Sequence, residues 1–163
     1  MYSAELPLVV EVEIEIPRGS CLKRGSSATL DFLSPLPCLY NYGSVRAYIG
    51  GDGDYLDALV LGPRLIRGAR VHVPVRAAVG ISERGIYEDK LICSDHAMSE
   101  EDRRRVEVFL RCYARCKALL NMMRGLSGSV RWEGWVEVEN AMGRALPVPA
   151  SRPVGLYVAN IIV

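Results

Sequence analysis

Short apolar runs separated by turn residues constrain the fold of this chain more than any other feature. The clearest run covers residues 10–16, where valine and isoleucine alternate with three glutamates, as in a strand buried on one face. Further short strands are predicted, with proline, glycine and charged residues between them, at residues 28–33, 58–61, 71–75, 77–81, 91–93, 130–136 and 156–163. Short strands at such regular spacing are typical of a small β-barrel.

One long helix is predicted in the second half of the chain. Residues 99–102 form a capping-box pattern with acidic residues in the first helical turn, and Gly125 ends the helix. Between them an apolar stripe follows i, i+3, i+4 spacing, made of Val106, Phe109, Leu110, Tyr113, Lys117 and Leu120. The stripe alone predicts a core position for Tyr113. We therefore expect an α+β fold, mainly β, in which this helix packs on the barrel.

Length and composition narrow the class of protein. The 163 residues fit a single domain, so we expect residues 1–163 to form one unit. No segment has the apolar length of a membrane span, and the first residues lack the basic start of a signal peptide, which predicts a cytoplasmic protein. A net charge of +1 favours neither nucleic-acid nor membrane binding. The absence of glutamine and the scarcity of asparagine favour a thermophilic source.

Counts of three residue types restrict the chemistry. The two histidines, His72 and His96, lie apart from other candidate ligands, which argues against catalysis based on histidine. The five cysteines have scattered spacings that favour buried thiols over a zinc site. Nearly all cations are arginines, and the only lysines are Lys23, Lys90 and Lys117. A compact ammonium that binds phosphate as a point charge is one reason to retain a lysine, and chance is the other.

Two acidic segments are candidates for a site. The first, residues 50–57, is a glycine-rich turn before a short apolar strand, in which we expect Asp52 and Asp54 to point the same way. Crowded carboxylates repel one another unless a cation lies among them, and Mg²⁺ prefers carboxylate oxygens. An exposed acidic hairpin turn is the alternative, and the segment alone leaves both open. The second cluster, within residues 83–90, is predicted as a solvated loop between strands.

Several segments together resemble the soluble family I inorganic pyrophosphatases. The matches occur in the family's order over about residues 9–141, at Glu15–Ser20 with Lys23, Asn41–Gly43, Asp52–Leu61, Glu83–Lys90, the Tyr113 helix and Glu133–Trp135. The most specific part is Asp-Gly-Asp-x-x-Asp at residues 52–57 together with Asn-Tyr-Gly at residues 41–43. The resemblance implies a five-stranded OB-like barrel with flanking helices, which agrees with the fold predicted from the strand pattern.

The resemblance also implies an activity, which is the Mg²⁺-dependent hydrolysis of pyrophosphate to two phosphates by a metal-activated water, with Mn²⁺ or Zn²⁺ as alternative ions. It implies that the metal ligands are Asp52, Asp54, Asp57, Glu83 and Glu88, with Glu15 in the outer shell. Asp54 corresponds to the carboxylate that takes the proton of the attacking water. The residues implied to contact the phosphates are Lys23, Tyr42, Lys90 and Tyr113. The residues implied to be catalytic are Asp54, Lys23, Tyr42 and Lys90. A homo-oligomer is implied as well, because bacterial and archaeal relatives are usually hexamers.

Several positions depart from the family pattern, among them Glu83 and Glu88 where the family has aspartates, Tyr55 in place of a proline and Arg24 in place of a tyrosine. Four further departures remove residues that the family has at its site. The family has a glutamate, an arginine, a tyrosine and a lysine where this chain has Gly25, Phe32, Cys38 and Ala114. Each lost charge-assisted contact to a phosphate costs about 1.5–3 kcal/mol of binding free energy. The departures support an alternative, a diverged homologue that binds metal or phosphate, or serves as an assembly subunit, without turnover. Candidate replacement cations are Arg18, Arg24, Arg46 and Arg115.

Overall fold

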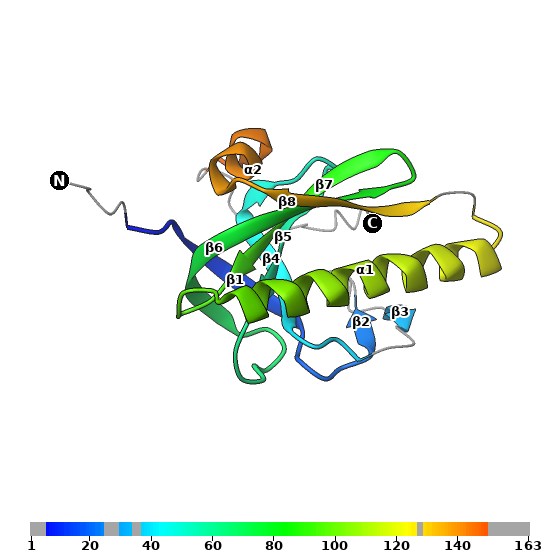
Figure 1. Ribbon diagram of the computed structural model, residues 1–163, viewed down its shortest axis with the longest axis horizontal. Coiled ribbons are helices and arrows are strands. Elements are labelled where there is room, and N and C mark those ends of the chain that lie inside the picture. The colour runs from blue at the N-terminus through cyan, green and yellow to red at the C-terminus, as the bar shows by residue number, and fades with distance from the viewer. Residues whose placement is uncertain (1–5, 25–29, 34–36, 127–128, 150–163) are drawn as a thin grey trace, which may run out of the picture.

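Five strands close into a ring in the computed structural model, which describes residues 6–24, 30–33, 37–126 and 129–149 (Figure 1). Around the ring the order is β1 (Val9–Ile16), β4 (Asn41–Ile49), β5 (Tyr55–Val60), β7 (Ile86–Cys93) and β6 (Arg70–Glu83). Pairing of β1 with β6 completes the closure. All neighbours are antiparallel except β5 and β7, which run parallel. This arrangement confirms the predicted α+β, mainly β class and its five-stranded OB-like ring.

The remaining elements extend or flank the ring. β8 (Val130–Val136) lengthens the sheet beyond β6, and β9 (Leu146–Pro147) pairs with β4. β2 (Leu22–Arg24) and β3 (Leu30–Leu33) form a separate two-stranded sheet. The long helix α1 (Glu100–Met123) lies along one side of the strands, and the short helix α2 (Val138–Arg144) lies near the opposite side (Figure 1). Neither helix within the described ranges combines the length and apolar character that crossing a lipid bilayer requires.

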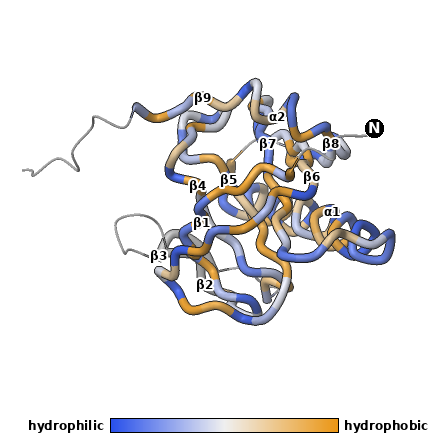
Figure 2. Tube along the Cα trace, turned by 90° about the vertical axis from the view of Figure 1, so that its left-hand side faces the viewer, coloured by the Kyte–Doolittle hydropathy of each residue, from blue (hydrophilic) through white to orange (hydrophobic). Residues whose placement is uncertain are grey.

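The alternation of strand side chains creates two apolar layers. Val12, Val45 and Ala58 belong to one buried cluster, which α2 also joins. Leu59, the next residue of β5, points the other way and packs in a second cluster with Val106 and Leu110 of α1. Figure 2 shows that apolar residues are concentrated on the strands of the ring, whose side chains contribute to both layers.

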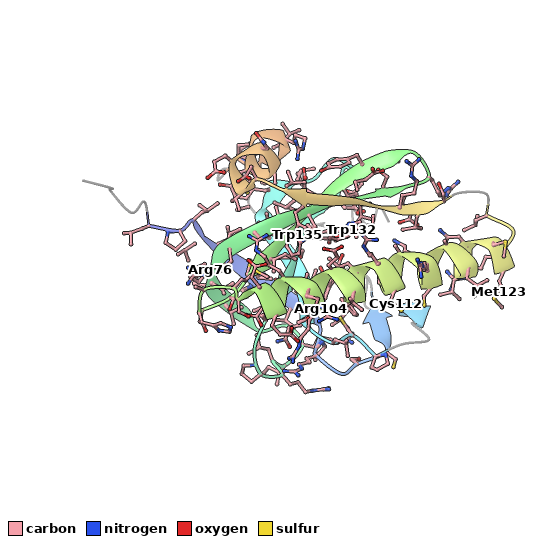
Figure 3. The ribbon with its side chains drawn as sticks, viewed as in Figure 1. Arg76, Arg104, Cys112, Met123, Trp132 and Trp135 are labelled. Carbon is pink, nitrogen blue, oxygen red and sulfur yellow. The ribbon has the colours of Figure 1, made fainter. Side chains whose placement is uncertain are left out.

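The predicted long helix is confirmed at both ends. The Ser99 side chain accepts from the backbone N–H of Asp102, whose carboxylate in turn accepts from the backbone N–H of Ser99, as a capping box requires. Gly125 follows the last turn with φ of +69°. β8 packs against the helix through its two tryptophans, which lie between the two elements in Figure 3. Trp135 Nε1 donates to Glu107 of α1 over 3.1 Å.

Several local predictions were wrong. Residues 41–43 were expected in an irregular loop but begin β4, and residues 88–89 were expected in a loop but lie within β7. The two strands predicted at 71–75 and 77–81 form one strand, β6, while α2 was not predicted at all. Residues 41–45 are buried throughout and therefore lack the alternation that marks a half-buried strand. The strand predicted at 156–163 lies outside the described residues.

The prediction of buried thiols holds for one cysteine. Cys93 is fully buried in the core, and this burial raises the pKa of its thiol to about 12. Cys112 is exposed, and Cys21, Cys38 and Cys116 are half-buried. All five thiols are free. The scattered spacing therefore did not indicate which of the thiols would be covered.

A close approach of β1 and β4 requires glycine at position 43. A Cβ at Gly43 would lie 2.1 Å from the carbonyl oxygen of Glu13, which is backbone and has little freedom to move. We expect Gly43→Ala to lower the free energy of unfolding by about 2 kcal/mol or more, measured by urea denaturation. The matched control is Gly143→Ala in α2, where an added methyl would meet no neighbouring atom within 4 Å, so the stability should not fall. Equal stability of the two variants would contradict this account.

Candidate functional site

Lys90 lies at the centre of the candidate site. Its Nζ donates to Asp57 Oδ2 over 2.5 Å and to Glu88 Oε2 over 3.1 Å. A third hydrogen bond of 3.1 Å goes to the hydroxyl of Tyr42. These three acceptors match the three N–H donors of an ammonium. The side chains converge because Asp57 lies opposite Lys90 on parallel strands, and Glu88 precedes Lys90 by two residues on the same face of β7.

Burial and neighbouring charges act in opposite directions on Lys90, whose exposed fraction is 3%. Burial lowers the pKa of the Lys90 ammonium, but its polar neighbours, first the Asp57 carboxylate and then Tyr42 and Glu88, together raise this pKa well above its ordinary value. Burial, and then the adjacent Asp57 carboxylate, raise the pKa of Tyr42 well above its usual range. At neutral pH the site therefore contains a charged ammonium beside a protonated phenol.

Asn41 anchors the strand that carries Tyr42. Its side-chain oxygen accepts from the backbone N–H of Arg18 over 3.0 Å and from that of Leu65 over 2.9 Å. Its amide nitrogen donates to the carbonyl oxygens of Val60 and Pro63. Asn41 is fully buried, so these four bonds satisfy a polar group that would otherwise destabilise the fold. An asparagine at this position therefore ties the loop after β1, the end of β5 and the loop after β5 to the start of β4.

The outer-shell candidate Glu15 lies at the end of β1. Its Oε1 accepts a hydrogen bond of 2.8 Å from Ser44 Oγ on β4. Ser44 lies opposite Asp57 in the β4–β5 pair. Glu15 is therefore linked to the strand pair that carries Asp57 through one serine, a connection that the sequence did not reveal.

The predicted metal loop is an exposed turn between β4 and β5. Asp52 and Asp54 are both exposed, and Asp52 Oδ1 accepts from the backbone N–H of Asp54 over 3.0 Å. The backbone bends at Gly53, with φ of +90°, so the expected extended geometry of the two aspartates was wrong. A Cβ at Gly51 would lie 2.6 Å from the carbonyl oxygen of Tyr87. The turn therefore lies directly against β7, beside Glu88.

Glu83, the last residue of β6, is engaged by α1. The Lys117 ammonium contacts its Oε2, and Asn121 Nδ2 donates to its Oε1 over 3.1 Å. Burial raises the pKa of the Glu83 carboxyl, but the hydrogen bond and charge of Lys117, together with the hydrogen bond from Asn121, outweigh this effect and leave the pKa below its ordinary value. The sequence stripe placed Lys117 on the packed face of α1 but gave no sign of this contact.

The acidic residue next to Glu88 serves a different purpose. Asp89 points to the opposite side of β7 and forms a two-pronged ion pair with Arg144 of α2, with N–O distances of 2.8 and 2.7 Å. Tyr87 donates to Asp89 Oδ1 over 3.0 Å. This pair fixes α2 on β7 and removes Asp89 from the candidate site.

A cleft of about 850 Å³ borders the site along α1. The buried Tyr42 and Lys90 and the half-buried Tyr113 line it, and so do the exposed Arg104 and Arg105. Tyr113 thus faces the cleft instead of contributing only to the core. Arg104 and Cys112, which also line the cleft, are labelled along α1 in Figure 3.

The remaining predicted residues are only partly placed. Lys23 lies on β2 opposite Phe32 of β3. The side chains of these two residues, and the whole of Gly25, are outside the part of the chain that the structure describes. Ala114 is buried in α1, and Cys38 lines the cleft. Two of the proposed replacement cations have other partners in the described chain: Arg18 Nη1 donates to the Gly62 carbonyl oxygen, and Arg46 pairs with Glu13. Arg115 is exposed.

The donor atoms of the site suit a hard divalent cation. Carboxylates from the acidic turn, β5 and β7 supply oxygen ligands of the kind that Mg²⁺ prefers. Asp57 and Glu88 already share a cation, the Lys90 ammonium. Within the described ranges, no three carboxylate, histidine or cysteine side chains lie close enough together to form a complete metal site. The carboxylate oxygens are therefore of a type that binds a metal ion, while in this structure Asp57 and Glu88 pair with the Lys90 ammonium.

Comparison with known proteins gives a consistent result. No protein-family model matches the chain. The inorganic pyrophosphatase of Gluconobacter oxydans (strain 621H) is 30% identical over 100 residues, which cover 56% of this chain and 58% of that protein. The chain therefore matches little more than half the length of this curated relative.

Solved structures match over a larger part of the chain. The inorganic pyrophosphatase from Thermus thermophilus superposes with a TM-score of 0.72 at 25% identity, covering 87% of this chain and 90% of that one. The Helicobacter pylori enzyme gives a TM-score of 0.69 at 20% identity, covering 88% and 92%. At the lower identity the likeness concerns the fold alone. Together with the sequence match, these structures confirm the resemblance to the soluble family I inorganic pyrophosphatases.

Proposed function

We propose that this chain, as a diverged member of the soluble inorganic pyrophosphatases, hydrolyses inorganic pyrophosphate to two phosphates. The observation that carries the proposal is the cluster of Lys90, Asp57, Glu88 and Tyr42, of which Tyr42 and Lys90 line the cleft. The Lys90 ammonium is a positive charge at a fixed position, and the two carboxylates beside it suit a divalent cation, which would add the positive charge that a polyanionic substrate needs. The match to the Thermus thermophilus enzyme, over nearly the whole of both chains, supports the same substrate.

A divalent cation is part of the proposal. We assign it to the carboxylates of Asp52, Asp54, Asp57 and Glu88, with Mg²⁺ as the first choice and Mn²⁺ or Zn²⁺ as alternatives. When bound, such an ion neutralises the charge of pyrophosphate and lowers the pKa of water. Glu83 is not assigned to the ion, since Lys117 and Asn121 already engage both of its oxygens.

The residues of the chain carry the remaining parts of the reaction. Water attacks one phosphorus atom, and the bond from that phosphorus to the bridging oxygen breaks, so the electron pair leaves with the second phosphate. Asp54 accepts the proton of the attacking water, the role of general base that the family resemblance implies for this carboxylate. Lys90, Tyr42 and Tyr113 border the cleft and stabilise the charge on the phosphates, and we propose that Lys23 joins them.

Phosphate release tests the proposed function directly. Purified protein with Mg²⁺ and pyrophosphate should release two phosphates for each pyrophosphate consumed, as measured with a colorimetric phosphate assay. Mg²⁺, Mn²⁺ and Zn²⁺ should each be tried at several concentrations. No release above the protein-free background with any of these ions would reject hydrolysis and favour a homologue without turnover.

We further propose that residues 1–163 act as one domain in a cytoplasmic homo-oligomer. This part of the proposal is supported by the family resemblance and by the near-complete overlap with the Thermus thermophilus chain. Sedimentation of the purified protein measures the assembly directly.

A further inference from the structure

Lys117 and Asn121 form a clamp on Glu83 that joins α1 to the end of β6. The two clamp residues are four positions apart, so they project from the same face of the helix. The exposed fractions of the Lys117 and Glu83 side chains are 27% and 21%, so the pair is largely shielded from solvent. Both carboxylate oxygens are occupied, one by the ammonium and one by the amide of Asn121.

The same ammonium lies within reach of the phosphate-facing groups. Lys117 Nζ lies 5.8 Å from the centre of the Tyr113 ring, and Tyr113 lines the cleft together with Lys90. Lys117 interacts electrostatically with both of these residues. Lys117 of α1 is therefore a second ammonium group near the site, and Tyr113 lies between it and the cleft that Lys90 lines.

We propose that Lys117 is a phosphate-positioning residue. Lys117 also remains paired with Glu83 when ligands bind, so Glu83 does not bind metal. The inference rests on the proposed function, because it assigns a residue within that function's site. An ammonium has three donors, so its contact with Glu83 leaves Lys117 able to donate to a phosphate oxygen. Glu83 in turn holds the long lysine side chain in one direction, which lowers the entropy lost when phosphate binds.

Binding measurements by calorimetry, with Mg²⁺ alone and with inorganic phosphate in the presence of Mg²⁺, separate the possible roles. Lys117→Met should weaken phosphate binding by about tenfold or more, the loss expected for one charge-assisted contact. The matched control is Arg115→Met, which removes the same charge from an exposed position about 200° around the helix and should leave phosphate affinity within about twofold. Lys117→Arg keeps the charge and should recover part of the lost affinity.

Glu83→Gln tests the second half of the inference. Because its carboxylate is assigned to Lys117, this variant should leave the number of bound Mg²⁺ ions unchanged and their affinity within about twofold. A loss of one bound ion, or a fall in Mg²⁺ affinity of about tenfold or more, would show that Glu83 is a metal ligand and overturn the assignment.

The outcomes also distinguish this inference from the proposed function. If the unmodified protein hydrolyses pyrophosphate but Lys117→Met binds phosphate as well as Arg115→Met does, the role of Lys117 is wrong and the function stands. If the unmodified protein neither binds phosphate nor hydrolyses pyrophosphate, the function is wrong and the inference is rejected with it. Circular dichroism of each variant confirms that the comparison is between folded proteins.

Discussion

We expect Asp54→Asn to lower the rate of pyrophosphate hydrolysis by at least about a hundredfold, because a general base accelerates a reaction by about 10²–10⁴-fold. Asparagine has nearly the same shape as aspartate but cannot accept a proton from the attacking water. Asp54 is exposed and its bond to Asp52 comes from its backbone N–H, which asparagine retains, so the substitution should leave the fold intact. The measurement is kcat for phosphate release at saturating substrate and Mg²⁺.

Asp95→Asn is the matched control for this experiment. Asp95 is also exposed and lies in the loop after β7, where its backbone carbonyl oxygen accepts a hydrogen bond from Arg76. Its kcat should stay within about twofold of the unmodified protein, because surface substitutions rarely change an active site. If Asp54→Asn retained activity comparable to Asp95→Asn, another residue would have to accept the proton.

The second large effect concerns stability. Lys90→Met should lower the free energy of unfolding by about 3 kcal/mol or more, because removing one partner of a buried ion pair leaves the other charges uncompensated. Asp57 and Glu88, which are 22% and 17% exposed, would then face each other without their shared cation. Urea denaturation at pH 7 measures this loss, and phosphate release from the same variant should fall as well.

The contribution of Lys90 also has a defined pH dependence. The pKa of Lys90 is raised in the folded protein, so its stabilising effect is fully present below the ordinary lysine pKa and is lost as pH rises through the folded-state pKa. The difference in stability between the unmodified protein and Lys90→Met should therefore be constant around neutral pH.

Arg105→Met provides the contrast for Lys90→Met. Arg105 pairs with Glu101 over 2.8 Å, but both side chains are more than half exposed. Breaking such a surface pair should cost less than about 1 kcal/mol. Similar losses for the two variants would show that the central cluster does not stabilise the fold more than an ordinary surface pair does.

The sequence predicted those parts of the fold that depend on local pattern. The predictions of β1 and α1 were correct because both elements have local signals in the sequence. Strand β1 has alternating apolar and polar residues, and α1 has a capping box and an apolar stripe. Strand β4 was missed because residues on both of its faces are buried, and α2 was missed because it has only seven residues. Neither element carries an alternation or an apolar stripe that is long enough to be detected.

The site was predictable only in part, for a related reason. The spacing of Asp57, Glu88 and Lys90 matched a known family, and the structure brings these three residues together. The contact of Lys117 with Glu83 joins residues 34 positions apart, which no local pattern records. The pairing of Asp89 with Arg144 was missed for the same reason, since it depends on where α2 packs.

The parallel pairing of β5 with β7 determines when this site can exist during folding. Two parallel neighbours cannot be joined by a tight turn, so the whole of β6 must be laid down before Lys90 can come beside Asp57. Contacts between residues far apart in sequence form slowly because the intervening chain loses entropy first. A nascent or partly unfolded chain therefore lacks the contact between Lys90 and Asp57, and any ligand that binds only this assembled cluster stabilises the fully closed ring.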